Sequence, residues 1–191
     1  MYKIIGVFVV ACTALVACQS VDSDTATTEE QEATAVFFPL ESYIEQEVAR
    51  LNEAGMPLEK HIWYNEQEET QTNNEIDYGK ELSLFRRADI NKPAWVDLYQ
   101  ADTIFQDERA REVRYQALDP ELEVRSLEVK WDKEGAVTEV KIRRESISTL
   151  ASNEYDLVYL PQEGYRINTL QQNRSADPVT IRIEGTFQEV K

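Results

Sequence analysis

The chain has 191 residues with 36 acidic and 20 basic side chains, and its net charge is −16 at pH 7. Such an excess of negative charge repels phosphate backbones and anionic head groups, which argues against nucleic-acid binding and against membrane binding through a basic patch. The length suffices for one domain with a conventional hydrophobic core.

The N-terminus begins with a targeting segment. Lys3 supplies its positive charge, and a mainly apolar run follows over residues 4–16. This run is shorter than the ~20 apolar residues that span a bilayer. It therefore predicts a signal peptide over residues 1–17 rather than a membrane helix.

The end of that segment, Leu15-Val16-Ala17-Cys18, resembles the lipobox of bacterial lipoproteins. The resemblance implies that the thiol of Cys18 is diacylglycerated, that the chain is cut just before Cys18, and that the new amino group is acylated. Two or three acyl chains anchor a protein stably in a membrane. Because Cys12 leaves with the signal, no thiol remains for a disulfide, a zinc site or cysteine catalysis.

Residues 18–35 begin with the lipidated Cys18 and are rich in Ser, Asp, Thr, Glu, Gln and Ala. Such a composition cannot bury enough apolar surface to offset the entropy of ordering, so it predicts a disordered acidic tether. An alternative interpretation is that the acidic residues form a sorting signal. The segment is similar to acidic stretches that direct some Bacteroidota lipoproteins to the cell surface, and the residues concerned are Asp22, Asp24, Glu29 and Glu30.

A single domain is predicted over residues 36–191, and its first half favours helices. Apolar residues at spacings of three and four, with Pro39 in the first turn and Gly55 as a stop, predict an amphipathic helix of about fifteen residues. A strand over 58–64, a polar loop over 65–74 and a second helix from Asp77 to a point before Pro93 follow. The apolar positions of the two helices are Phe37, Leu40, Ile44, Val48 and Leu51, and then Tyr78, Leu82, Phe85 and Ala88.

From about Val113 the apolar residues alternate, which predicts β-strands. The apolar residues of 122–124 and 127–131 are offset by one position, so we expect a bulge near Ser126. Short turns between strands make neighbours antiparallel. Turns are predicted at Asp132-Lys133-Glu134-Gly135 and Pro161-Gln162-Glu163-Gly164, and the last strand at 179–187. The expected fold is α+β, with N-terminal helices packed on a C-terminal antiparallel meander of five or six strands.

Several strings resemble a group of uncharacterised envelope lipoproteins of the Bacteroidota. These are Glu81-Leu82-Ser83-Leu84-Phe85, Asp89-Ile90-Asn91-Lys92-Pro93-Ala94, Val124-Arg125-Ser126-Leu127-Glu128-Val129 and the hairpin over 155–167. The resemblance implies an envelope location and one domain, and it brings no catalytic residue. The expected meander is also distantly similar to the curved sheets of periplasmic lipoprotein carriers, although none of their motifs matches.

Few residues point to chemistry. The string Asp89 to Pro93 favours a helix-ending turn, with a binding loop as the alternative. His61 is the single histidine, and Glu59 shares its face of the predicted strand, so a contact between them is expected. Acidic residues such as Glu66, Glu68, Glu69, Glu121 and Glu123 are too abundant for any pair to indicate a glycosidase. No cofactor and no metal site is predicted.

These observations predict a lipid-anchored envelope lipoprotein, in the outer membrane facing the periplasm or exported to the cell surface. We expect a non-enzymatic binding or assembly role, with an envelope protein as partner, through the sheet or the groove between helices and sheet. Aromatic residues that could line such a site are Trp63, Tyr64, Trp95 and Tyr99. One alternative is a carrier or sensor of a lipophilic ligand, which needs an apolar cavity between sheet and helices. Another is a carboxylate-dependent hydrolase, which needs two buried acids in a cleft.

Overall fold

The computed structural model describes residues 36–73 and 76–188. The predicted signal peptide over 1–17, the lipidation site Cys18 and the predicted tether over 18–35 lie outside the described residues. None of the described helices is long and apolar enough to cross a membrane.

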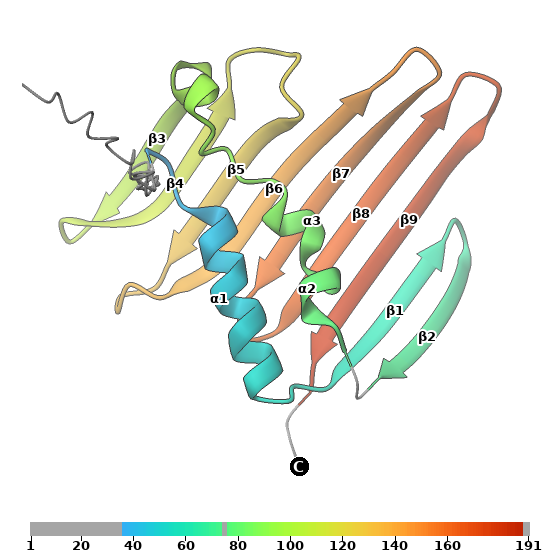
Figure 1. Cartoon of the computed structure of the whole chain (residues 1–191), viewed down its shortest axis with the longest axis horizontal. Coiled ribbons are helices and arrows are strands. Elements are labelled where there is room, and N and C mark those ends of the chain that lie inside the picture. The colour runs from blue at the N-terminus through green and yellow to red at the C-terminus, as the bar shows by residue number, and fades with distance from the viewer. Residues whose placement is uncertain (1–35, 74–75, 189–191) are drawn as a thin grey trace, which may run out of the picture. The chain divides into compact units, whose positions relative to one another are not determined.

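The described residues form one antiparallel sheet with helices on a single face (Figure 1). The helices are α1 (Leu40–Glu53), α2 (Tyr78–Glu81) and α3 (Ser83–Arg86), with a 3-10 turn η1 (Pro93–Leu98). The strands are β1 (Leu58–Tyr64), β2 (Gln67–Asn73), β3 (Tyr99–Gln106), β4 (Arg109–Ala117), β5 (Val124–Trp131), β6 (Val137–Ile147), β7 (Ala151–Leu160), β8 (Gly164–Asn173) and β9 (Ala176–Phe187).

The strand order corrects the predicted architecture. Within the described part of the chain the sheet has nine strands in the order β2-β1-β9-β8-β7-β6-β5-β4-β3, not five or six. The strands from β3 to β9 form a meander, and the β1–β2 hairpin adds to it through antiparallel pairing of β1 with β9. The predicted division into N-terminal helices and a C-terminal sheet is therefore wrong, because β1, which was predicted as a strand between the two helices, and β2 both belong to the same sheet.

Two strands, β2 and β3, were not predicted from the sequence, because they lie at the edges of the sheet. β2 occupies the region predicted as a polar loop, and its sequence contains no apolar residue to show alternation. It pairs with β1 along its whole length. β3 is the other edge strand, and nearly all of its side chains are exposed. Backbone hydrogen bonds can hold an edge strand in the sheet even when neither face of the strand is buried. Such a strand needs no alternation of apolar and polar residues, so its sequence does not reveal it.

The predicted first helix is confirmed with shifted bounds. Pro39 lies just before the helix, and α1 buries Leu40, Ile44 and Leu51 on one side. At its end the backbone of Gly55 takes a φ of +56°, and the amide of Met56 donates to the carbonyl of Leu51 at 3.1 Å. This is the left-handed helix stop that glycine favours.

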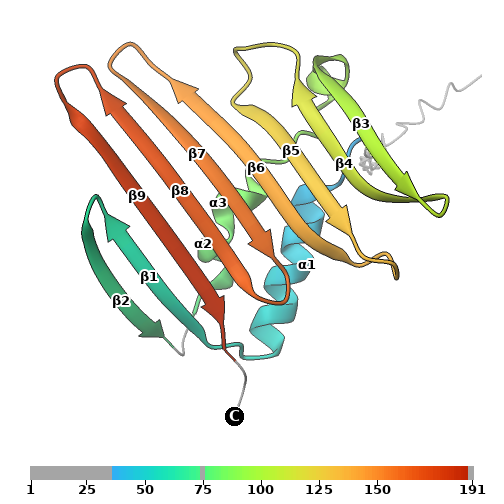
Figure 2. The same cartoon turned by 180° about the vertical axis from the view of Figure 1, so that it is seen from behind.

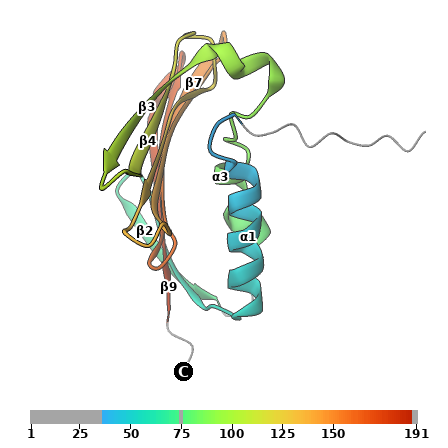
Figure 3. The ribbon, with the colours of Figure 1, turned by 90° about the vertical axis from the view of Figure 1, so that its left-hand side faces the viewer.

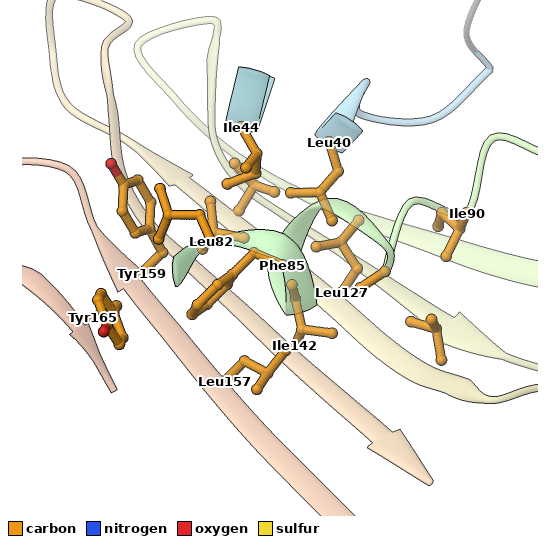
Figure 4. Packing of buried hydrophobic residues seen from close by; sticks show 14 of the residues in the cluster. Leu40, Ile44, Leu82, Phe85, Ile90, Leu127, Ile142, Leu157, Tyr159 and Tyr165 are labelled. Carbon is orange, nitrogen blue, oxygen red and sulfur yellow. The ribbon is translucent and has the colours of Figure 1, made fainter. Parts of the chain in front are cut away.

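The predicted second helix is divided in two at Leu82, where φ and ψ are −92° and 8°. Its predicted inward side chains are nevertheless all buried, and they are Tyr78, Leu82, Phe85 and Ala88. They share a core with the sheet (Figure 4), where Phe85 lies at 5.8 Å and 6.2 Å, between ring centroids, from Tyr159 and Tyr165. The helices thus cover the concave side of a curved sheet (Figure 3), which we call the helix face.

Partly buried carboxylates attach two of the helices to the sheet. The hydroxyl of Tyr159 donates to Glu47 of α1 at 2.7 Å, and Arg50 pairs with the same carboxylate. The hydroxyl of Tyr165 donates to Glu81 of α2, which also accepts from Lys60 at 2.9 Å. Burial, reinforced by the neighbouring carboxylates, raises the pKa of both tyrosines. Each hydroxyl therefore keeps its proton to a higher pH than a free tyrosine does.

The string from Asp89 to Pro93 holds the start of α1. The side chain of Asn91 accepts from the amide of Phe37 and donates to the carbonyl of Phe38, both at 2.9 Å. Asp89 accepts from the amide of Glu41 at 2.8 Å. Pro39 has no polar side chain that could cap the helix. Asp89, which comes from a distant segment of the chain, therefore accepts from one of the free amides in the first turn of α1.

Candidate functional site

The face of the sheet opposite the helices, which we call the outer face, is open over all strands (Figure 2). Its two halves differ in how their polar side chains are paired. Over β4, β5 and β6 the charges form a ladder that runs from strand to strand. The members of this ladder are Arg114, Glu128, Lys130, Glu139 and Lys141, joined by ion pairs of 2.8–3.3 Å.

The other half of the outer face contains a hollow of about 470 Å³. The strand register places the side chains that line the hollow in two adjacent rows, each of which crosses neighbouring strands. The first row is Trp63, Arg182, Asn168 and Asp156, on β1, β9, β8 and β7. The second row is Thr180, Leu170 and Glu154, on β9, β8 and β7. With Asn65 at the end of β1, these residues define what we call the outer-face hollow.

The hollow arises because short side chains stand between tall ones. Asn168 and Thr180 cover little of the sheet at its centre, and both are exposed. Arg182 does not reach over them, because its guanidinium lies 3.7 Å from the ring centroid of Trp63, on the opposite side from β8. Such a cation–π contact contributes about 0.5–1 kcal/mol at an exposed site.

The rim near Trp63 is held in place by its neighbours. Asn65 has a φ of 54°, and its side chain accepts from the amide of Thr180 at 3.0 Å. The ring of His61 stacks on Trp63 at 5.7 Å between centroids. His61 in turn contacts Glu68 and Glu59, each at 3.1 Å, and these hydrogen bonds raise its pKa. The predicted contact between His61 and Glu59 is therefore confirmed.

Two polar side chains in the hollow are free to bind a ligand. Neither Asn168 nor Asp156 has a side-chain hydrogen bond or ion pair with any residue in the described part of the chain. Glu154 is held loosely, at 3.6 Å from Arg143. The hollow therefore presents one amide and one carboxylate without a partner among the described residues, beside a half of the same face where charges are paired.

The aromatic residues singled out in the sequence separate into different places. Trp63 reaches the hollow, whereas Tyr64 is exposed and, as its neighbour in β1, lies on the helix face. Tyr99 is buried in the core, where its hydroxyl donates to the carbonyl of Val124 at 2.8 Å. Trp95 packs against that core and carries Lys92 over its ring.

The carboxylates singled out in the sequence do not form a buried pair. Glu66, Glu68 and Glu69 belong to the β1–β2 hairpin, and Glu121 and Glu123 precede β5; all five are exposed. Among the described residues, the buried charged side chain is a cation, Arg144, which pairs with Glu123. The geometry gives the hydrolase alternative no pair of buried acids.

A carrier of a lipophilic ligand would need an apolar cavity between the helices and the sheet. The outer-face hollow is not that cavity, because it lies on the opposite face from the helices. Between helices and sheet, the described side chains pack together as the core (Figure 4). Aromatic rings from α1, α3 and β7 fill the centre of this interface, with Tyr43 and Phe85 both beside Tyr159.

Trp63 was among the aromatic residues predicted to line a site, but the hollow itself was not predicted. The β7–β8 turn could have placed Asp156 opposite Asn168, because a short hairpin loop fixes the register. No local signal places Trp63 beside Arg182, since β1 and β9 are separated by most of the chain.

No family model matches the chain, and no curated protein or solved structure matches it either. The residues and their geometry therefore carry the functional argument.

Proposed function

We propose that this protein is a lipid-anchored lipoprotein of the cell envelope that binds another envelope component through the outer-face hollow, without catalysing a reaction. In this proposal Cys18 carries the lipid, the outer membrane facing the periplasm is the location, and residues 18–35 hold the domain away from the bilayer. The helix face is occupied by the protein's own core, so the outer face is the surface available for binding.

One observation carries the proposal. The hollow over β7, β8, β9 and β1 has unpaired polar groups at Asn168 and Asp156, beside the aromatic ring of Trp63. Concave sites with a few convergent polar groups and an aromatic wall are the usual form of a binding site. The ladder over β4, β5 and β6 has no such vacancy, because its charges satisfy one another.

Filling the hollow tests this function. We expect Asn168→Trp to reduce recovery of the bound envelope component about tenfold, because the new indole occupies the space above β8. Recovery is measured by affinity purification of the full chain from detergent-solubilised envelope. Gln116→Trp is the matched control, since Gln116 is also an exposed amide on the outer face, on β4.

Asn168→Trp should unfold at the same temperature as the original chain, because Asn168 is exposed and its side chain has no hydrogen bond to a described residue. Gln116→Trp should unfold slightly lower, because it removes the hydrogen bond from the Gln116 side chain to the carbonyl of Arg125 at 3.0 Å. Equal recovery with Asn168→Trp and Gln116→Trp would show that the hollow is not the binding site. Failure to recover any reproducible component with the original chain would contradict the binding function itself.

The anchor has its own test. Cells grown with radioactive palmitate should label the original chain, and Cys18→Ala should abolish the label and release the protein from the membrane fraction. The reason is that the thiol is the attachment point for the diacylglyceryl group, without which no acyl chain holds the domain. An unlabelled original chain would contradict the predicted location.

A further inference from the structure

We infer that the outer-face hollow binds a carbohydrate: a neutral, hydroxyl-rich segment of an envelope glycan. The inference rests on the proposed binding function and names the chemical class of the bound component. It is carried by the mixture of groups in the hollow and by the position of the hollow within the sheet.

The polar groups of the hollow demand a ligand that both donates and accepts hydrogen bonds. Asp156 and Glu154 only accept, whereas the guanidinium of Arg182 only donates, and the amide of Asn168 does both. A sugar hydroxyl is a donor and an acceptor at once, so a row of hydroxyls satisfies this set. Leu170 adds apolar surface, against which the C–H face of a sugar ring can pack, whereas the ring of Trp63 is already covered by the guanidinium of Arg182.

The position of the hollow argues against a peptide in extended form. Such a peptide binds by adding a strand to a free sheet edge, where backbone groups are unpaired. The four strands beneath the hollow are interior, and each is hydrogen-bonded to a neighbour on both sides. Only side chains are left to recognise a ligand here.

The charges of the hollow argue against an ionic ligand of one sign. Arg182 lies 3.8 Å from Glu184, and Glu154 lies 3.6 Å from Arg143, so each already has an opposite charge nearby. Asp156 has no ion pair among the described residues, but its carboxylate can accept hydrogen bonds from the hydroxyls of a neutral ligand. The volume of about 470 Å³ lies in the range of small-molecule sites, roughly 300–1,000 Å³. Because Asn168 and Thr180 are exposed, a short stretch of a longer glycan can enter from the solvent side.

The test is binding of the fluorescently labelled full chain to an array of short oligosaccharides of neutral hexoses and N-acetylhexosamines. The protein is kept in a detergent without a sugar head group. We expect at least one oligosaccharide to bind the original chain and Gln116→Trp equally, and Asn168→Trp about tenfold more weakly. Raising the salt from low to about 0.5 M should change binding less than about twofold, since neutral hydroxyls carry no charge to screen.

Two results would overturn the inference and leave the proposed function standing. One is recovery of the envelope component that falls steeply with salt, which would identify a charged component rather than a neutral glycan. The other is the absence of any oligosaccharide binding while an envelope component is still recovered in a manner that Asn168→Trp abolishes. If neither an oligosaccharide nor an envelope component binds, both the inference and the proposed function are wrong.

Discussion

Gly164→Ala will destabilise the domain by about 3 kcal/mol or more, because β8 begins where no side chain fits. Gly164 has a φ of +143°, and a Cβ atom built there would lie 1.9 Å from the carbonyl oxygen of Gly185 on β9. The atom it meets belongs to the backbone of a paired strand, so β9 would have to move away. That movement would disturb the pairing of β8 with β9, which crosses the floor of the outer-face hollow.

Gly135→Ala is the control that separates the steric clash of the new Cβ atom from the cost of a positive φ in a residue other than glycine. Gly135 also lies in a hairpin turn with a positive φ, +94°, but nothing lies within 4 Å of its Cβ position. It should lose only the conformational cost, about 1–2 kcal/mol. Thermal unfolding measures both, and for a domain of this size ~3 kcal/mol corresponds to roughly 6–12 °C. If the two substitutions lower the free energy of unfolding equally, then β8 and β9 can move apart to accommodate the extra atom without a further cost.

The helices and strands that bury regularly spaced apolar residues could be predicted from the sequence. The first helix, the β1 strand, the hairpin at Pro161 and the bulge near Ser126 were all predicted, and the last appears as a register shift between Val124 and Ser126. In each case side chains of one face enter the core, so the spacing of apolar residues carries the signal. The β2 and β3 strands carry little of this signal, because most of their described side chains stay in solvent, with Tyr99 of β3 as the buried exception.

The candidate site could not be predicted for a related reason. A hollow on a solvated face depends on which side chains are short and which way the long ones lean, and Arg182 leans toward Trp63. This direction follows from the pairing of β9 with β1, a contact between the two ends of the domain. Without an apolar period or a turn to fix that pairing, the sequence leaves the neighbours of Arg182 undefined.

The string from Asp89 to Pro93 shows how an unusual sequence can serve packing rather than ligand binding. Asn91→Ala should destabilise the domain by about 3 kcal/mol, because the amide of Phe37 and the carbonyl of Phe38 both lose their partner where the chain enters α1. Phe37 is buried, so water does not replace the lost bond freely. Urea unfolding measures the loss, and amide exchange should show the Phe37 amide losing its protection.

Lys92→Ala is the neighbouring control. Lys92 is exposed, and its contact with the ring of Trp95 is worth about 0.5–1 kcal/mol, so its removal should cost no more than that. Asp89→Ala should also cost more than Lys92→Ala, since it removes the hydrogen bonds that Asp89 accepts from the amide of Glu41 at 2.8 Å and from the amide of Asn91 at 2.6 Å. If Asn91→Ala costs no more than Lys92→Ala, the string does not hold α1 to the sheet. Its unusual sequence would then point back to the alternative of a binding loop.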